Sequence, residues 1–208
     1  MRVAKDYDLV DLTAIKQMAK AGLAHAAEAL APTTTHQFEM QVPAAHAVAL
    51  EDVPSAVGQP EEVVVAVLVP ISGEVEGHIA FLFPWDSACQ IWLSLVGTTP
   101  FGPKYVDELS SSVMLGLGDV LNSGFLKAIQ ERTGFNLSAK PPQISIDLCH
   151  AITASIVAKA EFEEAVALAV ETELFEYKGK PVRGHFLYVP HANGLDLMVS
   201  KLRASEAA

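Results

Sequence analysis

The sequence predicts a single α+β domain built from two diverged copies of one helix-and-sheet unit. Its 208 residues suit one domain or two fused half-domains, and half of them are hydrophobic, so a large core can form without disulfides or metals. The same order of elements occurs twice: a long helix, a short strand, an irregular piece, two long hairpin strands and a short amphipathic helix. A repeat of about 100 residues predicts a pseudo-two-fold fold with a shared antiparallel sheet.

The first half-repeat spans residues 8–97. Apolar residues at helical spacing predict a helix from Asp11, which can cap it, to about Leu30, before Pro32. Alternating or continuous apolar runs predict strands at 36–42, 47–50, 63–69 and 75–83. A short helix over 84–96 then ends at Gly97.

The second half-repeat spans residues 103–203 and follows the same order. Its long helix is expected over 105–132, its strands over 144–148, 165–177 and 182–189, and its last helix from 193 to about 202. Gly77-His78 of the first hairpin corresponds to Gly184-His185 of the second. Gly22 in the first long helix is matched with Gly124 in the second. The matching order favours a duplication over two chance hairpins.

Composition excludes several classes of function. The net charge is −11 and no basic stripe is present, so a nucleic-acid partner is not expected. The longest apolar run, 63–71, is too short to span a bilayer, and no signal peptide is recognisable, so we expect a cytoplasmic protein without membrane contact. Cys89 and Cys149 both lie in apolar stretches and are interpreted as buried hydrophobes of a reducing compartment.

The seven histidines do not predict a metal site, because none has a recognised ligand spacing to another His, Cys or acid. His78 and His185 hold equivalent repeat positions and are interpreted as structural. Phosphate loops and nucleophile elbows are also missing from the sequence, which argues against an ordinary hydrolase or nucleotide enzyme.

The second long helix carries an unusual polar patch. Asp119 and Asn122 are three residues apart, so we expect both side chains on one outward face, together with Ser112, Ser123 and Gln130. Most such pairs are simply a solvated helix face.

Gly116 and Gly118 flank this pair, and each costs about 1 kcal/mol relative to alanine inside a helix. Two explanations of these glycines are equally favoured. One is a backbone left open to a docking partner, and the other is close packing against the first long helix.

The residues around this pair resemble the CheC/CheX/FliY family of chemotaxis phosphatases, CheC most of all. The resemblance rests on Asp119-Val-Leu-Asn122-Ser-Gly-Phe-Leu-Lys-Ala-Ile, then Thr133-Gly134, Pro141-Pro142 and 144–147. It covers nearly the whole chain, from about 8 to 202, and includes the hairpin at 77–84. It implies a CheC-like fold in which two half-repeats share an antiparallel sheet, with two long helices packed on one face.

The family resemblance implies a specific chemistry. Its active helix carries Glu-x-x-Asn, with a proline some 22 residues further on and often Asp or Ser four residues before the Glu. The substrate is the aspartyl phosphate of a CheY-type response regulator, whose own Mg²⁺ and lysine neutralise the phosphoryl oxygens. What remains is to place a water in line with the scissile bond. Carried over, Asn122 would orient that water and Asp119 would pair with the regulator's lysine.

Three departures distinguish this chain from the family pattern. Asp119 replaces the Glu, Leu115 stands where Asp or Ser is frequent, and Pro141 or Pro142 follows Asn122 by only 19 or 20 positions. In the first helix the frame is Thr13-x-x-x-Gln17-x-x-Lys20, followed by Pro43 after 22 intervening residues. Gln17 cannot form the ion pair and Lys20 would repel the regulator's lysine, so this first site is expected to be degenerate.

The leading hypothesis is a phosphatase that docks on a phosphorylated CheY-like receiver domain and needs no cofactor of its own, Mg²⁺ coming with the partner. The alternative is an adaptor that has lost catalysis and binds a receiver domain, a CheD-type deamidase or a second copy of itself. A third, weaker hypothesis is a small-molecule sensor with a ligand between the halves.

Overall fold

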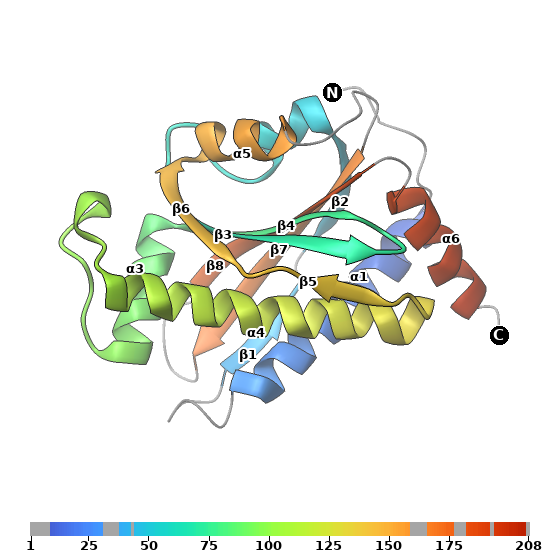
Figure 1. The fold of residues 1–208 in the computed structure, drawn as a ribbon, viewed down its shortest axis with the longest axis horizontal. Coiled ribbons are helices and arrows are strands. Elements are labelled where there is room, and N and C mark those ends of the chain that lie inside the picture. The colour runs from blue at the N-terminus through green and yellow to red at the C-terminus, as the bar shows by residue number, and fades with distance from the viewer. Residues whose placement is uncertain are drawn as a thin grey trace.

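The computed structural model describes residues 9–30, 38–42, 44–158, 166–176, 182–191 and 194–206. The strands of these residues form a sheet in the order β1-β7-β8-β4-β3-β5, with β2 paired to β7 and β6 paired to β3 (Figure 1). Their bounds are β1 Phe38–Gln41, β2 Ala45–Ala49, β3 Val63–Gly73, β4 Gly77–Pro84, β5 Leu137–Ala139, β6 Gln143–Leu148, β7 Val166–Glu176 and β8 Val182–Pro190. The pairings of the described strands are all antiparallel, which confirms the predicted sheet type.

The sheet is symmetric about the β4–β8 pair. Ile79 lies opposite Tyr188 and Phe81 opposite Phe186, so the two copies of the hairpin motif run antiparallel to each other at the centre. On either side, β3 and β7 extend the sheet, and the short strands β5 with β6 and β1 with β2 pair to them. This arrangement fits the duplication read from the sequence, while the half-repeat boundaries at 8–97 and 103–203 stay predictions.

Helices cover both faces of the sheet (Figure 1). On one face α1 (Leu9–Leu30) and α4 (Glu108–Thr133) pack against each other, with α3 (Trp85–Val96) and α6 (Gly194–Glu206) beside them. On the other face lie the short helices α2 (Val53–Ala56) and α5 (Cys149–Val157), which cover a second apolar cluster. The expectation of two long helices on one face is confirmed, and the pieces expected to be irregular turn out to contain α2 and α5.

The alternation of side chains along β3 explains the two clusters. Val65, Val67 and Val69 point into the α1/α4 side, whereas Val64 and Ala66 point into the α2/α5 side. A strand buried on both faces reads as a continuous apolar run, which is why the sequence shows no alternation here.

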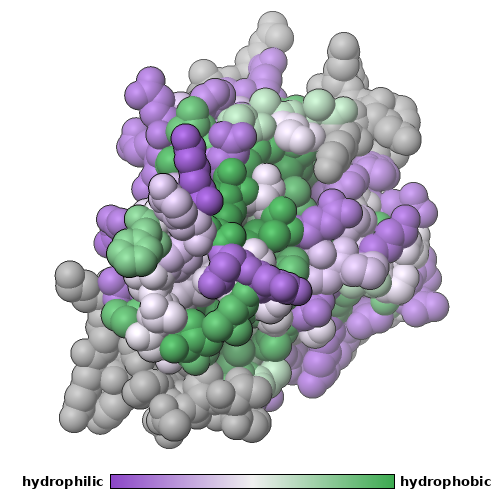
Figure 2. All heavy atoms as spheres, turned by 60° about the vertical axis from the view of Figure 1, so that its left-hand side comes forward, coloured by the Kyte–Doolittle hydropathy of each residue, from purple (hydrophilic) through white to green (hydrophobic). Residues whose placement is uncertain are grey.

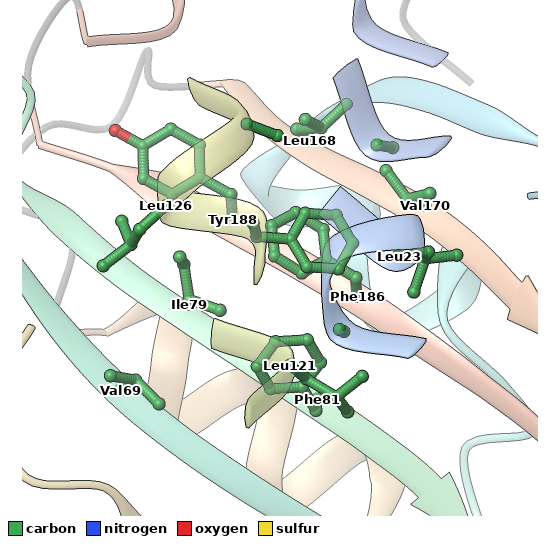
Figure 3. Close-up of a cluster of buried hydrophobic side chains, with 14 of the residues drawn as sticks. Leu23, Val69, Ile79, Phe81, Leu121, Leu126, Leu168, Val170, Phe186 and Tyr188 are labelled. Atoms are coloured by element: carbon green, nitrogen blue, oxygen red, sulfur yellow. The ribbon is translucent and has the colours of Figure 1, made fainter. Parts of the chain in front are cut away.

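Three aromatic rings join α4 to the centre of the sheet. Phe125 of α4 stacks on Phe186 of β8 with ring centroids 4.0 Å apart, and Phe81 of β4 lies 5.5 Å from Phe186 and 5.9 Å from Phe125. Figure 3 shows Phe81 and Phe186 among aliphatic side chains contributed by both long helices and by the strands beneath them. This cluster fixes α4 on the sheet at mid-length.

A capping side chain begins α4, and glycines end both α3 and α4. Asp107 is the N-cap of α4 and its carboxylate accepts a hydrogen bond from the Ser110 backbone N–H, which lowers the pKa of Asp107. Gly97 and Gly134 end α3 and α4 with φ of 73°, as expected of glycine stops. The predicted start of α4 at 105 is wrong, because Pro103–Tyr105 forms a separate 3-10 turn.

The predicted cap of α1 by Asp11 is also wrong. The helix already begins at Leu9, and the Asp11 carboxylate, which is 2 % exposed, binds the guanidinium of Arg203 on α6. Arg203 Nη2 donates to Asp11 Oδ2 at 2.6 Å, so this acid links the start of α1 to the end of the chain. The expected cap at Asn193 lies outside the described residues.

Both cysteines are free thiols, and Cys149 is buried as the sequence predicted. Cys89 was also expected to be buried but is only half-buried. Within the described residues, no helix has the length and apolar character needed to cross a bilayer.

Stability should depend on pH through His185. Burial lowers the pKa of this imidazole, and the facing Glu171 carboxylate opposes that shift without cancelling it. The unfolded chain therefore takes up a proton near the ordinary pKa of 6.5 while the folded protein resists it. The contribution of His185 is complete above that pH and is lost as the pH falls towards the folded pKa.

We expect His185→Gln to make the fall of Tm below pH 6.5 shallower than in the unsubstituted protein, with thermal unfolding followed by circular dichroism. His46→Gln, at an exposed position of β2, is the matched control. Parallel pH profiles for His185→Gln and the parent protein would contradict this assignment.

Candidate functional site

The exposed side of α4 carries a ridge formed by Ser112, Gly116, Asp119 and Ser123, and we call these four residues the α4 ridge. All four are exposed, and they follow one another at intervals of three or four residues along the helix. Asp119 is the acid of the ridge. The prediction that Asp119 faces solvent is therefore confirmed.

The prediction that Asn122 shares this outward face is wrong. Asn122 is 2 % exposed, and its Oδ1 atom is buried with no hydrogen-bond partner among the residues that the structure describes. Gln130, expected outside as well, is half-buried and donates to the Leu137 carbonyl of β5 at 3.2 Å. The polar patch is thus divided by the edge of the helix interface.

The rotation of α4 about its axis explains the burial of Asn122. Gly118, one turn before Asn122, faces β3 so closely that a Cβ atom there would lie 2.4 Å from Val67 Cγ1. Gly124 faces α1, where a Cβ atom would lie 2.4 Å from the Gly22 carbonyl oxygen. Residues 118 and 122 lie on one side of the helix, so the contact that seats Gly118 on the sheet also turns Asn122 inward.

The two glycines beside Asp119 have different explanations. Close packing accounts for Gly118, but against β3 and not against α1 as the packing hypothesis supposed. At Gly116 a Cβ atom would meet nothing within 4 Å, so packing gives no reason for glycine there. The hypothesis of an open backbone therefore survives for Gly116 alone.

An apolar patch lies at the start of the ridge. Phe101, Tyr105 and Leu109 are 102 %, 71 % and 58 % exposed, and Leu109 is one turn before Ser112 on the same helix. Figure 2 brings this side of the molecule forward and shows apolar side chains gathered in its middle, with hydrophilic ones around them. Sequence reasoning missed these three residues, although the segment 101–109 is visibly rich in large apolar side chains for a connection.

The first turn of α4, beside this patch, is fixed by a hydrogen bond from α3. The indole N–H of Trp92, which is fully buried on α3, donates to the Ser110 carbonyl at 2.9 Å, and Trp85 packs edge-on against Trp92 with ring centroids 5.5 Å apart. The two tryptophans thus have the packing role expected of them. They hold the start of α4 in place while Phe101, Tyr105 and Leu109 stay outside.

On α1, Gln17 and Lys20 are both exposed. Among the described residues no cluster of three or more His, Cys, Asp or Glu side chains could hold a metal ion. The α4 ridge therefore offers one carboxylate, two hydroxyls and bare backbone at its centre.

Known proteins resemble this chain over nearly its whole length. No family profile matches the chain. The CheY-P phosphatase CheC of Bacillus subtilis is 23 % identical over 194 residues, covering 92 % of this chain and 93 % of that protein. The crystal structure of Thermotoga maritima FliY superposes with a TM-score of 0.80 at 14 % identity and covers 96 % of this chain and 98 % of FliY.

The chain is similar to CheC proteins along most of its length and shares the fold of FliY and of a CheC-like superfamily protein. The family fold expected from the sequence is confirmed by the antiparallel sheet and its helices. A complex of CheX with CheY, BeF3 and Mg²⁺ from Borrelia burgdorferi has a similar fold, with a TM-score of 0.51 at 15 % identity over 83 % of this chain and 96 % of that one.

The two glycines provide a direct check on the rotation of this CheC-like helix. Gly118→Ala should lower the free energy of unfolding by about 1–3 kcal/mol, because its Cβ atom would overlap Val67 in a packed core. Gly116→Ala should raise it by about 0.5–1 kcal/mol, because alanine favours the helix and meets open space. Chemical denaturation of both variants measures the pair, and equal effects of the two substitutions would contradict this rotation.

Proposed function

We propose that this chain docks on the phosphorylated receiver domain of a CheY-type response regulator and accelerates hydrolysis of its aspartyl phosphate. The observation that carries the proposal is the similarity to a CheY-P phosphatase along nearly the whole chain. The exposed α4 ridge supports it, because a rigid helix face beside an apolar patch is suited to docking on a folded domain. Mg²⁺ belongs to the partner in this proposal, in keeping with the CheX complex that carries it.

In this proposal the chain contributes few catalytic groups of its own. Receiver-bound Mg²⁺ and lysine neutralise the phosphoryl oxygens, so the docking protein has only to position a water and exclude competing contacts. Asp119 is available to the partner's lysine or water, because its carboxylate is exposed on the ridge. The resemblance gives the water to Asn122, but burial of that amide argues against direct contact with the partner.

The burial of Asn122 also favours a second candidate, an adaptor that binds without catalysis. A receiver domain, a CheD-type deamidase or a second copy of this chain would be its partner. The same ridge would serve for docking, and the exposed patch of Phe101, Tyr105 and Leu109 would contribute apolar contact area.

The lifetime of a phosphorylated receiver decides between the two candidates. With catalytic amounts of this chain we expect the phosphoryl group to disappear faster than by the receiver's own hydrolysis. The Asp119→Ala variant should bind the receiver about tenfold more weakly, because it loses a charge-assisted contact. Asp86→Ala, which removes an exposed acid from α3, is the matched control.

Tight binding with an unchanged phosphoryl lifetime would select the adaptor. No binding to any cognate phosphorylated receiver would refute the phosphatase and would leave the adaptor only a CheD-type deamidase or a second copy of this chain as its partner.

The apolar patch can be tested separately. Phe101→Ser combined with Leu109→Ser should weaken receiver binding by roughly tenfold or more, because buried interface anchors carry much of the affinity. Tm should stay unchanged, since both side chains are exposed in the free protein. Calorimetric titration with a beryllofluoride-loaded receiver measures the effect, and Leu197→Ser on α6 is the control at a second exposed leucine. Unaltered affinity in the double variant would place the docking surface elsewhere.

A further inference from the structure

The two long helices match at an offset of 99 residues. Thr13, Gln17, Lys20 and Pro43 each lie 99 positions before Ser112, Gly116, Asp119 and Pro142. The three α1 residues of this set are exposed, and so are the three α4 residues. Proline follows after 22 intervening residues in both halves, counted from Lys20 in one and from Asp119 in the other.

Burial along the helices supports the same offset. The positions that are buried in both helices at this offset are the pairs Asp11/Ser110, Ile15/Met114, Met18/Leu117, Ala19/Gly118, Gly22/Leu121, Leu23/Asn122, Ala26/Phe125 and Leu30/Ile129. In this register Asn122 is the counterpart of Leu23, a core residue that is 3 % exposed.

The offset of 102 residues, which equates Gly22 with Gly124, fails this test. It pairs exposed Lys20 with buried Asn122 and buried Ala14 with exposed Gly116. The two glycines are in contact, because a Cβ atom at Gly124 would lie 2.4 Å from the Gly22 oxygen. Their contact reflects the crossing of α1 and α4, and equivalent positions in the two repeats are not needed to explain it.

We infer that Asp119 is the residue of α4 that meets the partner's reacting group, that Gly116 marks an emptied position beside it, and that Asn122 is a structural residue. This inference rests on the proposed function and deepens it. It follows from the register of the duplication, from the exposure of Asp119 and from the open space at Gly116. Gly116 and Asp119 then correspond to Gln17 and Lys20 of the first half, and the two pairs have diverged independently.

The inferred register predicts the chemistry at the second site. In the reaction a water oxygen forms a bond to phosphorus, the acyl-phosphate P–O bond breaks, the receiver's aspartate leaves with the electron pair, and the released phosphate takes the proton of the water. Asp119 can accept a hydrogen bond from that water, but its carboxylate has no hydrogen to donate and its charge opposes the phosphoryl oxygens. A carboxamide at 119 would both accept and donate without that charge.

The decisive substitution is therefore Asp119→Asn. We expect it to shorten the lifetime of the phosphorylated receiver at least about tenfold relative to the unsubstituted chain, since single positioned donors change such rates by factors of this size or more. Adding Gly116→Glu should strengthen binding relative to Asp119→Asn alone, because an acid one turn before the amide can pair with the receiver's lysine. Asn122→Leu should leave the phosphoryl lifetime as it is in the unsubstituted protein, and Asn122→Ser decides the point if the leucine variant does not fold.

Binding separates a failure of this inference from a failure of the proposed function. A receiver loaded with beryllofluoride and Mg²⁺ is titrated with each variant, and Asp119→Lys should abolish binding that Asn122→Ser preserves. If the unsubstituted chain accelerates hydrolysis, Asp119→Asn does not exceed it, and both Asn122 variants fold but lose acceleration, the inference is overturned and the proposed function stands. If the unsubstituted chain does not bind the loaded receiver, the proposed function fails first.

Discussion

The rotation of α4 about its own axis is the constraint on which this molecule depends. It is set at two close contacts, Gly118 against Val67 of β3 and Gly124 against Gly22 of α1, and it is held by the stacked rings of Phe125 and Phe186. Glycine at both positions lets backbone approach its neighbours to a distance that any side chain would prevent. This rotation decides which side chains α4 presents to a partner and which it buries.

The consequence for chemistry is a sharp division of one polar patch. Residues three apart on a helix differ by roughly 60° in direction, so the edge of an interface can pass between them. Here it passes between Asp119 and Asn122, leaving the acid in solvent and the amide in the core. Among the described residues the Asn122 Oδ1 atom has no hydrogen-bond partner, and a buried amide oxygen left unpaired costs about 1–3 kcal/mol that a leucine would avoid.

Much of the fold could be read from the sequence because periodicity and stops were clear. The helix ending at Gly97 and the strands of both hairpins follow from apolar patterns and from glycines at positive φ. The helices α2 and α5 were missed because each is short, and the apolar, β-branched run 152–157 does not distinguish helix from strand. Asp11 was misread as a cap because its partner, Arg203, is 192 residues away and no local signal announces it. The exposure of Asp119 was predictable from its charge, whereas the burial of Asn122 needed the contact between Gly118 and Val67, which sequence spacing alone does not reveal.

The register of the duplication has a further consequence for stoichiometry. The counterpart positions on the two long helices now carry a cation, Lys20, and an anion, Asp119. In the register inferred above, two corresponding exposed positions on α1 and α4 therefore carry opposite charges. A partner whose contact zone has a fixed sign of charge would be attracted at one of these positions and repelled at the other, which favours one partner for each chain.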